Sequence, residues 1–102
     1  MEIKKLAKIY KALSNENRLA IFKEILEHNR KEYEDDKGCI FFPSCPILYI
    51  KDKFKIGDST ISHHLKELEN ADLIITRKEG KYLIASINKV VLEKICEDLT
   101  FI

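Results

Sequence analysis

The stretch Ser59–Ile74 reads STISHHLKELENADLI and decides how the rest of the chain is interpreted. Its apolar residues gather on one side of a helical wheel: Ile61, Leu65 and Leu68. This spacing predicts an amphipathic helix that begins at Asp58 or Ser59 and ends near Asn70. One face of this helix is therefore expected in the core, and the other face is expected in solvent.

The polar face of this helix is a candidate surface for nucleic acid. Small hydroxyls, an imidazole and a lysine hydrogen-bond phosphates and base edges without charge conflict. The residues predicted to contact DNA are Ser59, Thr60, Ser62, His63 and Lys66. His64 lies nearer the apolar side, so we expect it to pack or to bond to the backbone. Asp58 is expected to cap the helix and is left out of the DNA set, because a carboxylate repels phosphate.

Elements on both sides of this helix complete a helix-turn-helix with a wing. Upstream, Ile47–Phe54 is a short helical pattern that ends before Gly57. Downstream, Leu73–Arg77 and Tyr82–Ile87 are rich in β-branched and aromatic residues, and a Lys-Glu-Gly-Lys turn separates them. We therefore predict a two-stranded hairpin that follows the recognition helix as a wing.

The charge distribution supports a polyanionic partner for the wing. Eighteen basic and seventeen acidic side chains leave a net charge of +1, so whole-chain charge favours no class of partner. At the wing, Arg77, Lys78 and Lys81 oppose only Glu79. Most lysines simply lie on a solvated surface, but basic hairpin tips beside a recognition helix contact phosphate or the minor groove. These three residues are therefore predicted to contact DNA.

Helices are also predicted at both ends of the chain. Their apolar stripes are Ile3, Leu6, Ala7 and Tyr10 in the first and Leu92, Ile95, Cys96 and Leu99 in the last. Ser14-Asn15 interrupts the first pattern, and either residue can cap a second helix, which ends near His28–Arg30. Asn88 can cap the last helix. Because the core of a 102-residue domain is thin, we expect the first and last helices to meet in a homodimer.

The predicted fold class is mainly α with a small β-hairpin. Residues 1–102 form a single winged helix-turn-helix domain in the order α-α-(insert)-α-α-β-β-α. The insert covers about residues 30–46 and opens with the charged run Lys31–Lys37. A structureless connection of this length is uncommon inside a compact domain and is usually functional or disordered.

Composition excludes several classes of protein. No apolar run approaches the roughly 20 residues that span a bilayer, and the first residues lack the pattern of a signal peptide. Three cysteines do not make a secreted disulfide framework, so we expect a cytoplasmic protein with reduced thiols. There is no Gly-rich phosphate loop, and Ser62, His63 and His64 point about 100° apart along a helix, so no enzyme is predicted.

Three segments together resemble the ArsR/SmtB family of winged-helix repressors. They are Asn15–Leu26 (NENRLAIFKEIL), Ser59–Ile74 and the wing segment Arg77–Leu83 (RKEGKYL). The resemblance covers most of the chain outside the insert. It implies a homodimeric prokaryotic repressor, dimerised through its first and last helices, which leaves operator DNA when a metal, metalloid, sulfur species or other signal binds.

Neither metal site of the resembled family is reproduced in this sequence. Aligned on the recognition helix, the family's thiol positions fall on Pro46 and Leu48, which do not bind metal, and Cys45 is out of register by one. The family's other site uses Asp, His and Glu on the last helix, but Asn88–Leu99 contains no His. We therefore predict no resident metal or other cofactor.

The two cysteines of the insert are the remaining candidates for a sensor. Cys39 and Cys45 could capture a thiophilic metal, metalloid or sulfur species, or form a reversible disulfide. The alternative is that they and the apolar run Ile40-Phe41-Phe42 only pack the insert in place. Cys96 lies on the apolar stripe of the last helix and is expected to be buried and inert.

Two functions from different classes fit these patterns. The first is a dimeric, sequence-specific DNA-binding regulator, a repressor released from its operator by a small inducer or a redox signal. The alternative is a winged-helix adaptor that contacts another protein through Ile40-Phe41-Phe42 and lacks specific DNA binding. Salt-dependent binding to duplex DNA distinguishes the two.

Overall fold

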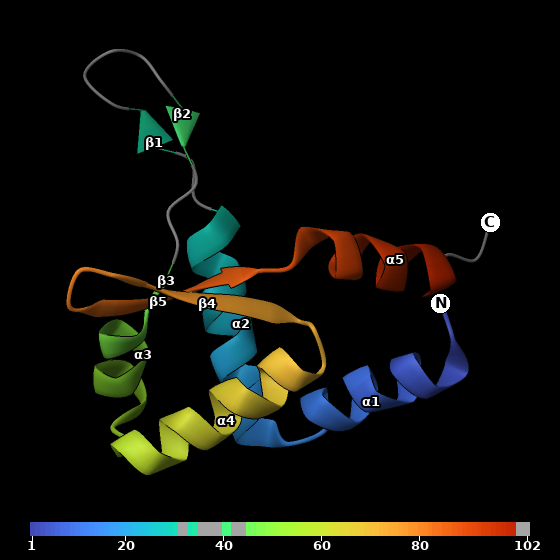
Figure 1. Cartoon of the computed structure of the whole chain (residues 1–102), viewed down its shortest axis with the longest axis horizontal. Helices are drawn as coiled ribbons and strands as arrows, with labels where there is room; N and C mark the ends of the chain where they lie inside the picture. The colour runs from blue at the N-terminus through green and yellow to red at the C-terminus, as the bar shows by residue number, and fades with distance from the viewer. Residues whose placement is uncertain (31–32, 35–39, 42–44, 100–102) are drawn as a thin grey trace.

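The computed structural model describes residues 1–30, 33–34, 40–41 and 45–99 (Figure 1). Its helices are α1 (Ile3–Leu13), α2 (Glu16–Arg30), α3 (Ile47–Phe54), α4 (Asp58–Asn70) and α5 (Lys89–Leu99). Its strands are β1 (Tyr33–Glu34), β2 (Ile40–Phe41), β3 (Cys45–Pro46), β4 (Ile74–Glu79) and β5 (Tyr82–Ile87). The helices and the wing hairpin follow the predicted order, which confirms the winged helix-turn-helix fold class.

Side-chain caps explain where α2 and α5 begin. The side-chain oxygen of Asn15 accepts a hydrogen bond from the backbone N–H of Arg18 at 3.0 Å, and Asn88 accepts one from Val91 at 3.4 Å. The expected cap at Asp58 is wrong, because the N-cap of α4 is Gly57, without a side-chain hydrogen bond. Asp58 is the first helical residue, and its carboxylate pairs with the ammonium group of Lys51 on α3 instead.

Two turns set the angle of the helix-turn-helix and the shape of the wing. The turn between α3 and α4 has its left-handed residue at Lys55, with φ 53°, whereas Gly57 is extended with φ −78°. In the wing, Gly80 has φ +61° and forms a two-residue hairpin loop with Lys81. The wing therefore has a glycine, Gly80, at its left-handed position, where glycine is favoured. In the helix-turn-helix the left-handed position is occupied by Lys55 and not by Gly57.

The sheet has three strands, in the order β3-β5-β4, and not the two that were predicted. Cys45 pairs with Ala85 on the far edge of β5, so the insert ends before this residue and not at 46. β1 and β2 also pair with each other, where a structureless connection was expected. Strands of two residues are too short to show the alternation that predicts a strand, so sequence periodicity did not reveal them.

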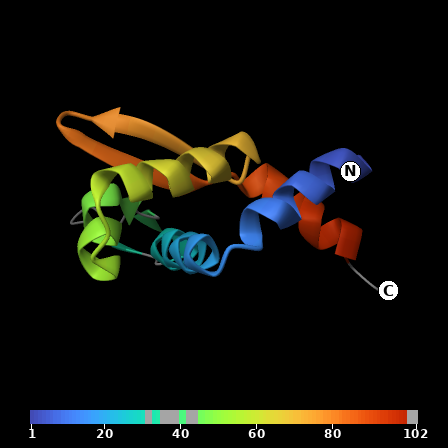
Figure 2. The same cartoon turned by 90° about the horizontal axis from the view of Figure 1, so that it is seen from below.

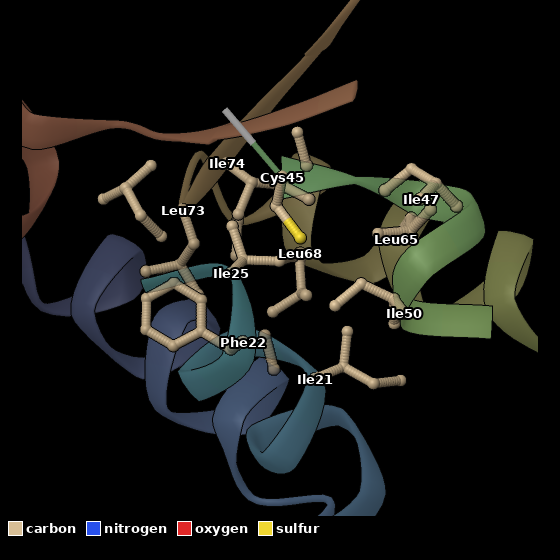
Figure 3. Close-up of a cluster of buried hydrophobic side chains, with 14 of the residues drawn as sticks. Ile21, Phe22, Ile25, Cys45, Ile47, Ile50, Leu65, Leu68, Leu73 and Ile74 are labelled. Atoms are coloured by element: carbon tan, nitrogen blue, oxygen red, sulfur yellow. The ribbon is translucent and has the colours of Figure 1, made fainter. Parts of the chain in front are cut away.

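The core lies between the sheet, α2 and the apolar faces of α3 and α4. α2 runs across the sheet and contacts β5 (Figure 1). Figure 3 shows its side chains meeting those of α3, α4 and the sheet, and the cluster includes Ile21, Phe22, Ile25, Cys45, Ile47, Ile50, Leu65, Leu68, Leu73 and Ile74. Each large aliphatic side chain buried here stabilises the fold by about 1.5–3 kcal/mol. This packing fixes α4 with its polar face in solvent.

The two ends of the molecule carry different elements. α1, α5 and the N-terminus lie at one end, while the wing tip and the start of α4 lie at the other (Figure 2). In α1 the buried residues are Ile9 and Ala12, whereas Ile3 of the predicted stripe is 77% exposed and Tyr10 is also exposed. Three residues of the predicted stripe, Ile3, Ala7 and Tyr10, are therefore exposed in the single chain, and Leu6 is partly buried. In the part of the chain that the structure describes, we find no helix with the length and apolarity to span a membrane.

Candidate nucleic-acid interface

The recognition helix α4 separates its residues by face as the sequence predicted. Its core face consists of Ile61, His64, Leu65 and Leu68, all buried. All five α4 residues predicted to contact DNA are exposed: Ser59, Thr60, Ser62, His63 and Lys66. The packing of His64 is confirmed as well, because only 8% of this residue is exposed. The exposed face offers hydroxyl and imidazole groups for base edges and one ammonium group for phosphate.

The wing presents its three predicted basic residues to solvent, but they are not equivalent. The Arg77 guanidinium donates to one carboxylate oxygen of Glu79 from Nη2 at 2.8 Å and from Nε at 3.2 Å. The ammonium group of Lys81 lies 5.5 Å from the centre of the Tyr82 ring, a cation–π contact. Lys78 is exposed and makes no ion pair with a residue in the described ranges. Glu79 therefore offsets part of the positive charge at the wing.

The wing and α4 are held together as one unit. The Thr76 hydroxyl of β4 donates a hydrogen bond to the carboxylate of Glu69 near the end of α4. The wing tip and the start of α4 project at the same end of the molecule (Figure 2). The structure thus brings the two predicted DNA-contacting sets to one end of the fold.

Polar contacts between α2 and α3 support the recognition helix from behind. Glu24 accepts hydrogen bonds from the ammonium group of Lys53 at 2.8 Å and from the Tyr49 hydroxyl at 3.1 Å. The Lys53 hydrogen bond lowers the pKa of Glu24 most, and burial opposes it. The ring of His28 meets Tyr49 edge-on, with centroids 4.6 Å apart. These contacts hold α3 against α2, and the Lys51–Asp58 ion pair links α3 to the start of α4.

The three cysteines occupy very different surroundings. Cys45 is completely buried in the core, and burial raises the pKa of its thiol to about 12, with a further contribution from the Glu24 charge. Since the thiolate is the reactive form, these findings count against Cys45 as a sensor. Cys39 lies outside the described residues. The expected burial of Cys96 is wrong for the single chain: Cys96 is exposed on α5, because Val91 with the partly buried Leu92 and Ile95 forms the packed face.

The sequence did not lead us to expect that Arg18 is buried. Arg18 of α2 is 9% exposed, and its guanidinium donates to the carbonyl oxygen of Ala12 at 3.1 Å. Its position three residues before Ile21 places it on the apolar face of α2, and this spacing was the available signal. Within the described residues, no group of three or more His, Cys, Asp or Glu side chains is arranged to hold a metal ion.

Comparisons with known proteins match this architecture. The model of a family described as bacterial regulatory proteins, arsR family, matches residues 50–76, which include all of α4. Over 102 residues, the chain is 30% identical to the arsenical resistance operon repressor of Staphylococcus aureus and covers 84% of that protein. The chain belongs to the ArsR family. It is therefore an ArsR-family transcriptional regulator, and the resemblance seen in the three sequence segments is confirmed.

Solved structures show that the ArsR-family fold extends through most of the chain. HlyU from Vibrio cholerae superposes with a TM-score of 0.65 at 22% identity, covering 97% of this chain and 98% of its own. A homodimeric winged helix-turn-helix DNA-binding domain from Mycobacterium bovis superposes with a TM-score of 0.64 at 20% identity, covering 94% and 81%. At these identities the structures establish the fold alone.

Proposed function

We propose that the protein is a dimeric repressor that binds a specific operator in the cytoplasm of a prokaryotic cell. The observation that carries this proposal is the exposed polar face of α4, which lies at the same end of the fold as the basic wing. A helix of this size fits the major groove, and a hairpin beside it reaches the flanking backbone. Family membership and the arsenical operon repressors among its relatives support the same function.

The residues of the interface divide into two roles. Ser59, Thr60, Ser62 and His63 are proposed to lie near base edges or phosphates of the major groove. Lys66, Arg77, Lys78 and Lys81 are proposed to supply attraction to phosphate, which strengthens binding without selecting sequence. Because Arg77 is already bound to Glu79, Lys78 is the first wing residue expected to reach the DNA.

Dimerisation through α1 and α5 completes the proposal. These helices expose large apolar residues that a single chain leaves in water: Ile3, Tyr10, Val90 and Leu99. A two-fold axis through this end would present two copies of α4 to half-sites about one DNA turn apart. The homodimeric relative from Mycobacterium bovis has the same fold, which supports this assembly.

An inducer that releases the operator remains part of the proposal. The predicted capture of a thiophilic metal, metalloid or sulfur species by Cys39 and Cys45 loses support, because Cys45 is buried and its thiol pKa is raised to about 12. We therefore expect an inducer that does not require a reactive thiolate at Cys45.

Salt-dependent binding to the DNA upstream of the protein's own gene tests the proposal. The logarithm of the binding constant should fall linearly with the logarithm of salt concentration, by about 0.9 per phosphate contact. Replacing Arg77, Lys78 and Lys81 together by Ala should flatten this slope. A matched control replaces Lys4, Lys8 and Lys11, which are exposed on α1 and belong neither to the wing nor to α4, and should leave the slope unchanged.

Base recognition needs a separate measurement, since the wing does not select sequence. Ser62→Ala or His63→Ala should change the preference among operator variants by about 1–3 kcal/mol if a base contact is lost. Binding that is independent of salt, or equal for operator and scrambled duplexes, would favour the adaptor that contacts protein through Ile40-Phe41-Phe42.

A further inference from the structure

A single tight turn joins the recognition helix to the wing. The backbone N–H of Asp72 donates to the carbonyl oxygen of Glu69 at 2.9 Å, and that of Leu73 donates to the carbonyl oxygen of Leu68 at 3.0 Å. Asp72 holds the left-handed conformation that this helix ending requires, with φ 60°. From the turn, β4 runs back toward the start of α4 (Figure 2). The direction of β4 therefore decides where the wing lies relative to the exposed face of α4.

The base of β4 is buried, but the rest of the strand leaves the core. Leu73 and Ile74 are buried, and after Ile74 the one residue of β4 that is not exposed is Thr76. Its hydroxyl donates a hydrogen bond to the carboxylate of Glu69, on the other side of the turn. This contact holds β4 against α4 at the point where the strand leaves the core.

Thr76 shares a face of β4 with Lys78. Alternate residues of a strand point to the same face, and the hydrogen bond from Thr76 shows that this face is turned toward α4. Arg77 and Glu79, which bind each other, lie on the opposite face. The contact between Thr76 and Glu69 therefore sets the position of the wing lysine that makes no ion pair within the described residues.

A small rotation of β4 at Thr76 becomes a large displacement at the wing tip. Gly80 is four residues further along, and a strand rises about 3.3 Å per residue, so the tip lies about 13 Å beyond Thr76. A rotation of about 10° would move the tip by about 2 Å. Hydrogen bonds form over a range of only about 2.7–3.2 Å, so this displacement is enough to separate the contacts of the wing from those of α4.

We propose that Glu69 is a positioning residue of the DNA interface. By accepting the hydrogen bond from Thr76, its carboxylate holds the wing at the angle at which Lys78 and the exposed face of α4 reach one operator half-site together. Glu69 acts through Thr76 and does not itself contact DNA. This inference rests on the proposed function, and it gives an acidic residue a favourable part in binding a polyanion.

The first arm of the test removes the hydroxyl. Thr76→Val keeps a β-branched side chain that suits a strand but donates no hydrogen bond, whereas Thr76→Ser keeps the donor. Thr76→Val should weaken operator binding about threefold to tenfold. It should also flatten the salt slope by about 0.9 per protomer, which corresponds to one phosphate contact. Thr76→Ser should bind like the wild type. A residue that only stabilises the fold would lower Tm without changing the slope.

The second arm uses the sign of the charge effect. Electrostatics alone would strengthen binding when a negative charge near phosphate is removed. Glu69→Ala should nevertheless weaken binding about threefold to tenfold, because the wing loses its attachment. Glu69→Gln keeps an oxygen that accepts the hydrogen bond and should bind at least as tightly as the wild type. The matched control is Glu67→Ala, the same loss of charge at a partly buried position of α4, which should not weaken binding.

The third arm determines whether Glu69 acts through the wing. In a protein with Arg77, Lys78 and Lys81 replaced by Ala, neither Thr76→Val nor Glu69→Ala should weaken binding further, because the contacts that they position are already lost. A further loss as large as in the wild-type background would overturn the inference. Thermal unfolding of each variant identifies any that does not fold, and Thr76→Val and Glu69→Ala remove the same hydrogen bond from opposite sides.

The orientation of the wing is measured in the protein without DNA. Residual dipolar couplings of the backbone amides of β4 and β5 are compared with those of α4. They should change in Thr76→Val and stay as in the wild type in Thr76→Ser. Unchanged couplings, unchanged affinity in Thr76→Val, or no recovery in Thr76→Ser each overturn the inference while the wild type still binds its operator. If the wild type shows no salt-dependent operator binding, the proposed function fails and this inference fails with it.

Discussion

Both ends of the molecule expose side chains that are proposed to contact a partner. The free energy of exposing them to water differs, because one end exposes mainly polar groups of the proposed interface and the other exposes apolar groups. At the end with the wing and the start of α4, the residues proposed to contact DNA are charged or polar and well solvated, although Tyr82 and Leu83 of the wing are exposed as well. At the end with α1 and α5, Ile3, Val90 and Leu99 are each more than half exposed. Apolar area in water costs about 25 cal/mol per Å² relative to burial. The exposed apolar residues of α1 and α5 are therefore the ones that the proposed dimer would remove from water, whereas the groups proposed to contact DNA are well solvated in its absence.

The largest expected effect comes from charging the apolar end. Leu99, which is 63% exposed, is replaced by Glu, and Leu48→Glu on α3, at 54% exposure, is the matched control. Leu99→Glu should convert a dimer into a monomer, because a buried carboxylate at the interface is costly. Loss of the second recognition helix should then weaken operator binding by about 10²–10⁴-fold. Sedimentation gives the mass, and an operator titration gives the affinity.

The control makes this prediction specific to one end. Leu48→Glu should keep the dimer mass. The assignment of α1 and α5 to the dimer interface is contradicted if the wild-type protein sediments as a stable monomer. It is also contradicted if Leu99→Glu and Leu48→Glu dissociate the dimer equally.

A smaller effect is expected from releasing Arg77 at the wing. Glu79→Gln removes the carboxylate that now holds the guanidinium in two hydrogen bonds. Operator affinity should rise about twofold to fivefold at low salt, and the salt slope should steepen by up to about 0.9 per protomer. Glu93→Gln, an equal change of charge on exposed α5, is the control. An equal gain in both variants would mean that net charge, and not the freed Arg77, causes the effect.

The elements that sequence predicted well are those whose signal is local. The faces of α4 and the caps at Asn15 and Asn88 each follow from residues within a few positions of one another. The edge strand at Cys45 was missed because it depends on Ala85, forty residues away. The surface pocket lined by Asn17, Ile56 and Thr60 was invisible for the same reason, since residues of α2, α4 and the turn before α4 line it only after these elements pack together. Contacts distant in sequence leave no periodic pattern to detect.

Backbone changes in the turn between α3 and α4 should alter stability without altering the apolar end. Lys55 holds a left-handed conformation with φ 53°, which glycine adopts at lower cost. Lys55→Gly should raise the free energy of unfolding by about 0.5–1 kcal/mol in urea denaturation. Gly57→Ala is the control, because φ is −78° and a Cβ there meets no atom within 4 Å. A stabilisation at Gly57 larger than at Lys55 would contradict this account of the turn.

The smallest effect is expected between the two ends, at the contact of α2 with α3. Hydrogen bonding to Lys53 lowers the pKa of Glu24 below 4.5, its ordinary value, against the opposing effect of burial. A carboxylate whose folded pKa is depressed stabilises the fold above its unfolded pKa, and this contribution is lost as the pH falls through the folded pKa. Glu24→Gln should therefore lower Tm by about 2 °C at pH 7, and by progressively less below pH 4.5.

The control for this change is Glu27→Gln on the same helix. Glu27 pairs with Arg30 at 3.4 Å, but both side chains are largely exposed, so its loss should lower Tm less than the loss of Glu24. Dimer mass should not change in either variant, because Glu24 contacts α3 and not the apolar residues of α1 or α5. A Tm difference for Glu24→Gln that stays constant from pH 7 to pH 3 would show that lost packing, and not the ionised carboxylate, causes it. A change in dimer mass would show that the contact of α2 with α3 is coupled to the distant apolar end, and the two ends would then no longer be independent.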